Sequence, residues 1–204
     1  MLLQRLDATR SLLAVMDDMA ALRILSELLA RLVAVPAPAG LRKLSDVAAT
    51  LLDRAAAAQS RLPDRSDRRL VEACAASLRE VLDQPGDRLL HWDLHYDNVL
   101  AAPPSSGREE WLAIDPKPLA GDPGFDLYPA LWNRWDEVEK SGDVARAVRS
   151  RFDLMTDVLA LDRRRAARWT LGRALQVMVW TIESGETHLP AIPSALAHVL
   201  LNPR

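Results

Sequence analysis

The sequence predicts an α+β domain that is mainly α-helical and contains one small β-hairpin. Most of the chain repeats apolar residues at the three- and four-residue spacing of amphipathic helices. Only a short central region has the brief apolar runs, separated by turn residues, that are typical of strands. With 204 residues the chain is long enough to form one domain with a substantial core.

Three helices are predicted before the centre. The first, over 17–35, has aspartates at its start and prolines directly after its end. The second and third cover 45–61 and 66–82, and a Pro-Gly pair stops the third. The single cysteine, Cys74, lies at helical spacing with apolar residues of the third helix. We therefore expect this thiol in the core and exclude a disulfide framework.

Two short strands are predicted at the centre, over 98–101 and 111–114. A run of proline, serine and glycine at 103–107 is turn material that joins them into the hairpin. A further apolar run, over 88–92, precedes them, and Asp115 follows the second strand directly. The chain then returns to helix, with predicted helices over 126–135, 143–160, 162–184 and 193–201.

A polar loop beside this hairpin has the spacing of a phosphoryl-transfer site. His91-x-Asp93 is followed by four residues and then by Asn98, as in kinase loops where the Asp faces the acceptor hydroxyl and the Asn binds metal. Taken alone, this spacing also fits an ordinary turn, since these residue types are common in turns. Asp115 adds a second carboxylate, and phosphoryl transfer needs oxygen ligands that hold Mg²⁺ against the phosphates. Together these residues predict such a site.

Three runs of sequence resemble the aminoglycoside phosphotransferases, and within them the streptomycin 6-kinase and hydroxyurea phosphotransferase branch. The runs are 91–100 (His-Trp-Asp-Leu-His-Tyr-Asp-Asn-Val-Leu), 113–118 (Ala-Ile-Asp-Pro-Lys-Pro) and 121–127 (Gly-Asp-Pro-Gly-Phe-Asp-Leu). Residues 2–6 also resemble the hinge between the two lobes of that branch. The resemblance implies a protein-kinase-like C-terminal lobe over 11–204, preceded by a hinge remnant over 1–10.

The resemblance implies a role for each residue of the motif. Asp93 would be the catalytic residue, and Asn98 and Asp115 would hold Mg²⁺, with ATP as the phosphoryl donor. Because a carboxylate is a weak base for an alcohol at neutral pH, we expect Asp93 to orient the acceptor hydroxyl rather than to remove its proton early. Structural support of the loop is expected from His91, His95 and Asp126.

Further residues are candidates for binding phosphate, acceptor or nucleotide. Lys117 lies two residues beyond Asp115, where its ammonium is expected either to reach a phosphate oxygen or to be a plain surface charge. Acidic and aromatic residues near 132–137 suit a cationic acceptor, although a solvated helix edge has the same composition. The acidic candidates are Asp97, Asp136 and Glu137. The nucleotide hinge would include Leu3, Gln4 and Arg5.

The sequence lacks the features that grip ATP from the other side. It contains neither Gly-x-Gly-x-x-Gly nor a Walker A sequence, and Lys43 is the only lysine before the loop. The resemblance implies an ATP-dependent O-phosphotransferase for an alcohol group of a streptomycin-like aminoglycoside, or for hydroxyurea, that confers resistance. Because the ATP-gripping features are missing, we expect little activity without its N-terminal lobe. The alternatives are an inactive remnant or binding module that keeps the acceptor pocket, and another small-molecule kinase.

Charge and hydropathy restrict the partners. The 26 basic and 28 acidic residues nearly cancel, so no overall field favours nucleic acid or an anionic membrane. No membrane span or signal peptide is recognisable, which predicts a cytoplasmic protein. The expected partner is a cationic small-molecule substrate. A lobe cut at its hinge would expose apolar surface, so a homodimer or a separate N-terminal lobe is also expected.

Overall fold

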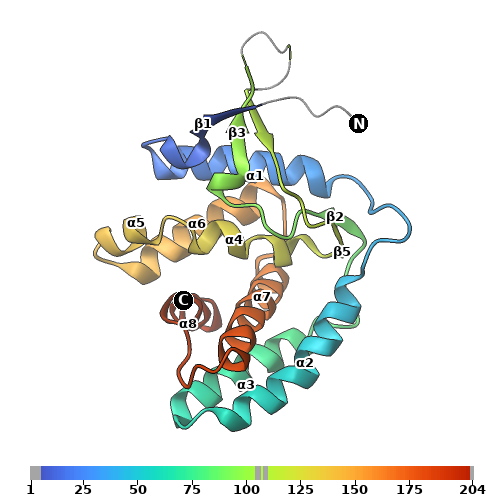
Figure 1. The fold of residues 1–204 in the computed structure, drawn as a ribbon, viewed down its shortest axis with the longest axis vertical. Helices are drawn as coiled ribbons and strands as arrows, with labels where there is room; N and C mark the ends of the chain where they lie inside the picture. Colours follow the sequence, from blue (N-terminus) through green and yellow to red (C-terminus); the bar gives the residue numbers. More distant parts are fainter. Residues whose placement is uncertain (1–5, 104–106, 108–109, 203–204) are drawn as a thin grey trace.

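The computed structural model describes residues 6–103, 107 and 110–202 and is mostly helical (Figure 1). The three helices predicted before the centre are present, with ends within a few residues of those expected. They are α1 (Asp18–Val33), α2 (Leu44–Arg61) and α3 (Arg65–Arg79). Aspartate side chains fix two of the starts, because Asp17 accepts from the Ala20 N–H and Asp64 accepts from two N–H groups of α3.

The strands form two small sheets rather than one hairpin. The predicted hairpin is β3 (Val99–Ala101) with β4 (Trp111–Ala113), paired with Leu100 opposite Leu112. Three other strands are β1 (Asp7–Ser11), which pairs with β3, and β2 (Arg88–Leu90), which pairs with β5 (Leu119–Gly121). β1 and β5 were not predicted, and β1 lies largely within the segment expected to be a hinge remnant. Both are short and lack the alternation of a half-buried strand, so they form through their partners.

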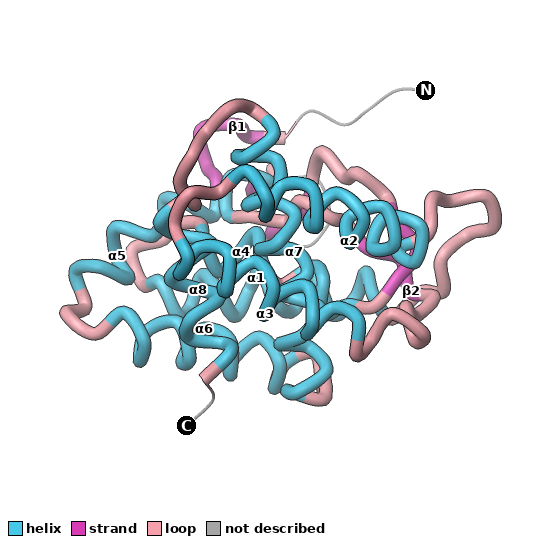
Figure 2. Tube along the Cα trace, turned by 90° about the horizontal axis from the view of Figure 1, so that it is seen from below, coloured by secondary structure: helices cyan, strands magenta, loops and turns pink. Residues whose placement is uncertain are grey.

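The second half of the chain is helical, as Figure 2 also shows from below. Its helices are α4 (Tyr128–Trp132), α5 (Trp135–Lys140), α6 (Val144–Val158), α7 (Arg163–Glu183) and α8 (Ala191–Leu201). A single helix over 126–135 was wrong. Arg134 has a left-handed backbone with φ of 54°, which separates α4 from α5. None of the described helices is both long and apolar enough to cross a bilayer.

A buried network of charges fixes this break. Arg151 of α6 is only 2% exposed, and its guanidinium donates to the Asp18 carboxylate at 3.0 Å and to the carbonyls of Asn133 and Arg134. The Arg134 side chain turns back to the Val15 carbonyl at 2.8 Å. The start of α1 is thereby joined to the turn between α4 and α5.

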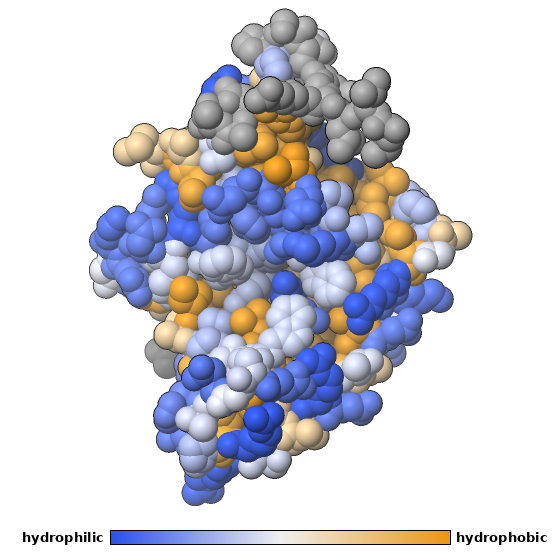
Figure 3. Space-filling view, viewed as in Figure 1, coloured by the Kyte–Doolittle hydropathy of each residue, from blue (hydrophilic) through white to orange (hydrophobic). Residues whose placement is uncertain are grey.

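Apolar side chains are exposed where the chain enters α1. Among the described residues, Leu13, Met16 and Met19 are exposed, and Met16 is 93% exposed. Figure 3 shows apolar side chains at the top of this face, where β1 and the start of α1 lie in Figure 1, above a hydrophilic band. Most of the remaining large apolar side chains are buried.

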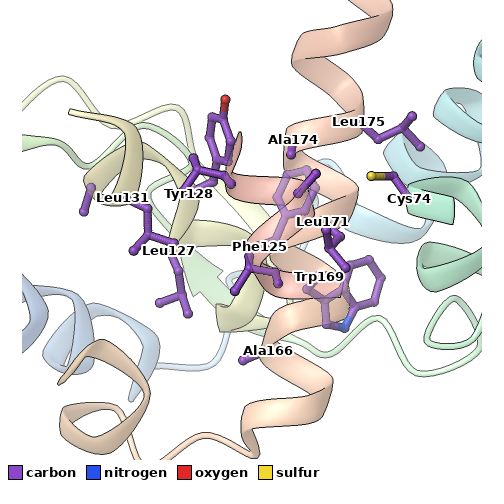
Figure 4. Packing of buried hydrophobic residues seen from close by; sticks show 14 of the residues in the cluster. Cys74, Phe125, Leu127, Tyr128, Leu131, Ala166, Trp169, Leu171, Ala174 and Leu175 are labelled. Carbon is purple, nitrogen blue, oxygen red and sulfur yellow. The ribbon is translucent and has the colours of Figure 1, made fainter. Parts of the chain in front are cut away.

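The core is built around α7. This helix packs against α2, α3 and α8 and against a short 3₁₀ turn, η4 (Pro123–Asp126). Trp169 of α7 meets the Phe125 ring edge-on at 6.3 Å, and Cys74 is fully buried, as predicted, on the other side of the helix (Figure 4). η4 is therefore seated on a helix that packs against three others.

Candidate active site

The 91–98 loop is held by one buried carboxylate. Asp126, in η4, has no exposed surface, and its two oxygens accept the N–H groups of His91 and Trp92, both at 2.6 Å. Trp92 has a φ of 67°, which is rare for a bulky residue and costs conformational energy. The bidentate contact of Asp126, which was expected to support the loop, stabilises this strained backbone.

His91 joins the loop to the strand end that carries Asp115. Its ring is buried, Nδ1 accepts the Asp93 N–H at 3.4 Å, and Nε2 therefore carries the proton and donates to the Ile114 carbonyl at 3.0 Å. Burial lowers the pKa of His91, which favours this neutral form. The Lys117 N–H donates to the His91 carbonyl at 3.0 Å. These contacts join the loop to the end of β4, and we keep structural support of the loop as the expected role of His91.

The side chain of Asn98 is oriented by its neighbours. Its Nδ2 group donates to the Asp93 carbonyl at 2.8 Å and lies 3.1 Å from His95 Nε2. His95 Nδ1 donates to the Asp97 carboxylate at 3.2 Å, which leaves Nε2 free to accept. Because both hydrogen bonds of the amide involve its nitrogen, its oxygen is turned to the opposite side. His95 thus supports the loop by fixing which atom Asn98 presents.

One ammonium group brings the two carboxylates of the motif together. Lys117 Nζ is hydrogen-bonded to Asp93 Oδ2 and lies 3.6 Å from Asp115 Oδ2. The bond to Asp93 raises the pKa of Lys117, so the lysine is charged at neutral pH. Asp115 has a left-handed backbone with φ of 55°, a conformation that aspartate tolerates better than most residues. Lys117 is therefore exposed, but it also contacts the carboxylates of the motif. The sequence had not distinguished a site residue from a plain surface charge.

The oxygen atoms of Asn98 and Asp115 fit a divalent ion that arrives with phosphate. The two residues flank the paired strands β3 and β4, and the Ile114 N–H donates to the Asn98 carbonyl at 2.9 Å. Within 6–103, 107 and 110–202, no cluster of three or more His, Cys, Asp or Glu side chains is placed to hold a metal. Mg²⁺ prefers six oxygen ligands and commonly takes only one or two from protein carboxylates. Phosphate and water would supply the others.

Comparison with known proteins identifies the family of this chain. Residues 1–185 match the family model described as aminoglycoside/hydroxyurea antibiotic resistance kinase. The chain belongs to this kinase family. Its members are phosphotransferases, which confirms the family inferred from the motif.

Streptomycin 6-kinases and a hydroxyurea phosphotransferase are similar to this chain over nearly its whole length. It is 56% identical to a streptomycin 6-kinase of Streptomyces glaucescens and 51% identical to one of Streptomyces griseus, over 98% and 100% of the chain. It is 54% identical to a hydroxyurea phosphotransferase of Kitasatospora aureofaciens over 98% of the chain. The matched regions are 64%, 65% and 56% of those proteins, so the chain spans less than two thirds of each.

The three acidic candidates for acceptor binding have different surroundings from one another. Asp97 is beside Asn98 in the site, where it also accepts from the Asn133 amide at 3.3 Å. Asp136 is paired with a lysine of its own helix at 2.8 Å, and Glu137 is paired with Arg134. The structure thus brings only Asp97 to the loop. Leu3, Gln4 and Arg5, the expected nucleotide hinge, lie outside the described residues.

Two residues close to the loop were not predicted from the sequence. Arg42 lies over the Trp92 ring at 5.5 Å, beside the loop. Arg173 of α7 is buried close enough to Asp93 and Asp126 for their charges to act on it. The signal for Arg173 was a charged residue within the otherwise apolar stretch of α7. Its distance along the chain from the motif gave no reason to connect the two.

Proposed function

We propose that this chain supplies the acceptor- and metal-binding lobe of an ATP-dependent O-phosphotransferase that confers antibiotic resistance. The acceptor would be an alcohol group of a streptomycin-like aminoglycoside, or hydroxyurea, as the names of the relatives suggest. The observation that carries the proposal is the convergence of Asp93 and Asp115 on the Lys117 ammonium. Two carboxylates and a cation at one loop suit transfer of a charged phosphoryl group.

In this proposal Asp93 accepts a hydrogen bond from the acceptor hydroxyl and directs its oxygen at the γ-phosphorus. The new oxygen–phosphorus bond forms as the bond from that phosphorus to the β,γ-bridging oxygen breaks, ADP leaves, and the hydroxyl proton passes late to Asp93. Lys117 offsets negative charge on the transferred group. Asn98 and Asp115 would hold Mg²⁺, which neutralises phosphate oxygens when it is bound.

The rest of such an enzyme would be the part of its relatives that this chain does not match. We assign to it the N-terminal lobe that holds ATP, joined through a hinge at 1–10 or supplied by another chain. The exposed Leu13, Met16 and Met19 lie next to that segment and support a contact there. An apolar contact of this kind would explain why large side chains remain exposed beside a well-filled core.

Phosphoryl transfer from labelled ATP to streptomycin or hydroxyurea tests the proposal. The assay uses the 204-residue chain alone and the chain fused to the part of the S. glaucescens enzyme that it does not match. We expect negligible transfer by the chain alone and transfer by the fusion. Asp93→Ala should lower kcat/KM of the fusion by about 10³-fold or more, because positioning and electrostatics supply most of the catalysis.

Glu72→Ala is the matched control, because it removes a carboxylate from a surface ion pair of α3. Its kcat/KM should stay within about twofold of the parent fusion. An active Asp93→Ala fusion would refute the assignment of Asp93. If the fusion folds and transfers to neither acceptor, and calorimetry shows acceptor binding that is indifferent to ATP and Mg²⁺, the chain is a binding module.

A further inference from the structure

Arg173 is a buried cation beneath the 91–98 loop. It lies in the middle of α7, one turn beyond Thr170, whose hydroxyl donates to the Gly124 carbonyl of η4 at 2.8 Å. Only 8% of Arg173 is exposed. Its guanidinium carbon is 6.0, 5.8 and 5.3 Å from the ring centres of Phe125, Tyr128 and Trp180. Figure 4 shows Phe125 and Tyr128 on the side of α7 away from Cys74.

The hydrogen bonds of Arg173 do not account for its burial. A guanidinium has five N–H donors, and within the described residues the side chain donates to the Gln176 amide oxygen at 3.0 Å while its buried Nε has no partner. Aromatic faces contribute about 0.5 to 2 kcal/mol each, whereas an ion taken out of water costs several kcal/mol. These contacts leave the buried Nε–H of Arg173 without an acceptor, which lowers the stability of the fold.

The acids that act on Arg173 belong to the site. Its charge interacts with the carboxylates of Asp93 and Asp126, and Asp126 is fully buried against the loop. The titratable and charged groups around Asp126 come from each packed element: His91 and Asp93 from the loop, Asp122 of η4 with Arg165 of α7, Tyr128 of α4, and Arg173. Asp122 and Arg165 are bonded to each other at 2.6 Å, and Arg173 is a cation whose charge acts on Asp126.

We propose that Arg173 is a positioning residue whose charge favours the ionised form of Asp126, in which both oxygens of that carboxylate accept from the 91–98 loop. Asp126 accepts two N–H groups, and an ionised carboxylate accepts more strongly than a protonated one. Arg173 thus controls the conformation that carries Asp93 without touching the reacting atoms. The proposal concerns the loop of this chain and holds whichever acceptor is phosphorylated.

Nuclear magnetic resonance of the 204-residue chain with labelled aspartate tests this inference directly. The carboxyl signal of Asp126 and the amide protons of His91 and Trp92 are followed from about pH 5 to about pH 9. Burial raises the pKa of Asp126 to about 7 in the wild-type protein. Arg173→Gln keeps the size and the partner amide but removes the charge, and should move the midpoint up by roughly one unit or more. Arg173→Lys should restore a midpoint near the wild-type value.

Arg164→Gln is the matched control, since Arg164 is an exposed residue of the same helix and the change in net charge is identical. Its midpoint should equal that of the wild type. An unshifted midpoint in Arg173→Gln, or an equal shift in Arg164→Gln, would overturn the proposal. If Arg173→Gln folds poorly, adding Asp126→Asn leaves no buried charge to balance, and the double variant should be the more stable above about pH 7. A less stable double variant would also overturn it.

Discussion

Replacing Gly124 with alanine should displace η4 from α7 and with it the anchor of the 91–98 loop. A Cβ atom at Gly124 would lie 2.7 Å from the Cα of Ala166 and 3.1 Å from its carbonyl oxygen. Carbon atoms in contact are normally about 3.5 to 4.0 Å apart, so one backbone must move by roughly 1 Å. Overpacking of this kind costs about 1 to 3 kcal/mol, and the reduced freedom of the unfolded alanine chain offsets only about 0.4 to 1 kcal/mol.

We therefore expect Gly124→Ala to lower the free energy of unfolding by about 1 to 2 kcal/mol. The melting temperature should fall by about 2 to 8 °C for a chain of this size. Urea and thermal unfolding followed by circular dichroism measure the change. The amide protons of His91 and Trp92 should shift in the folded variant, because their acceptor, Asp126, belongs to the displaced turn.

Gly172→Ala in α7 is the informative comparison. Its added Cβ would also be too close to a neighbour, at 2.8 Å from Leu78 Cδ1, but that atom is the end of a flexible side chain. Alanine is favoured over glycine within a helix by about 1 kcal/mol, so the two effects should nearly cancel. If Gly124→Ala is as stable as the wild type, or loses no more stability than Gly172→Ala, the backbone contact does not seat η4.

Three other predictions concern buried groups. Arg151→Met should lower the free energy of unfolding in urea by about 3 to 5 kcal/mol, because it removes a buried partner of the Asp18 carboxylate. Arg163→Met at the surface should lower it by under about 1 kcal/mol, and equal losses would contradict this prediction. The Cys74 thiol, whose pKa burial raises to about 12, should react with a thiol reagent at neutral pH only after unfolding, and rapid native labelling would count against its burial. The raised pKa of Asp126, about 7 against about 3.9 unfolded, gives stability that is complete below about pH 4 and is lost as pH rises through about 7, up to roughly 4 kcal/mol. Unfolding measured between these pH values should show this fall in the wild type and not in Asp126→Asn, and parallel profiles would refute it.

Local sequence patterns were sufficient to predict most of the helices and to find the residues of the motif. The aspartate that precedes α1 satisfies one free N–H group within its own turn, so its effect is visible in the sequence. The spacing of Asp93 and Asn98 is likewise local. By contrast, β5 is three residues long and exists because it pairs with β2 across some thirty residues of chain. Such a strand has no pattern of its own.

Long-range contacts explain what the sequence did not reveal about the site. The sequence left two roles open for Lys117, a phosphate ligand or a plain surface charge, because only the fold places its ammonium against Asp93. The break at Arg134 depends on Arg151 of another helix, which binds the carbonyls at the turn. Arg173 is separated from the 91–98 loop by more than seventy residues, and its relation to Asp126 arises from the packing of α7 on η4.

The dependence of the 91–98 loop on η4 and α7 also sets an order for its folding. During synthesis from the N-terminus, the motif is complete once Asp115 has been added, but its carboxylate anchor comes later at Asp126 and the helix beneath that anchor ends only at Glu183. Until α7 is made, η4 lacks the helix on which it packs, so Asp126 is not yet fixed where it stabilises the strained backbone of Trp92. A nascent chain can therefore contain every residue of the motif and still lack the geometry that makes them a site.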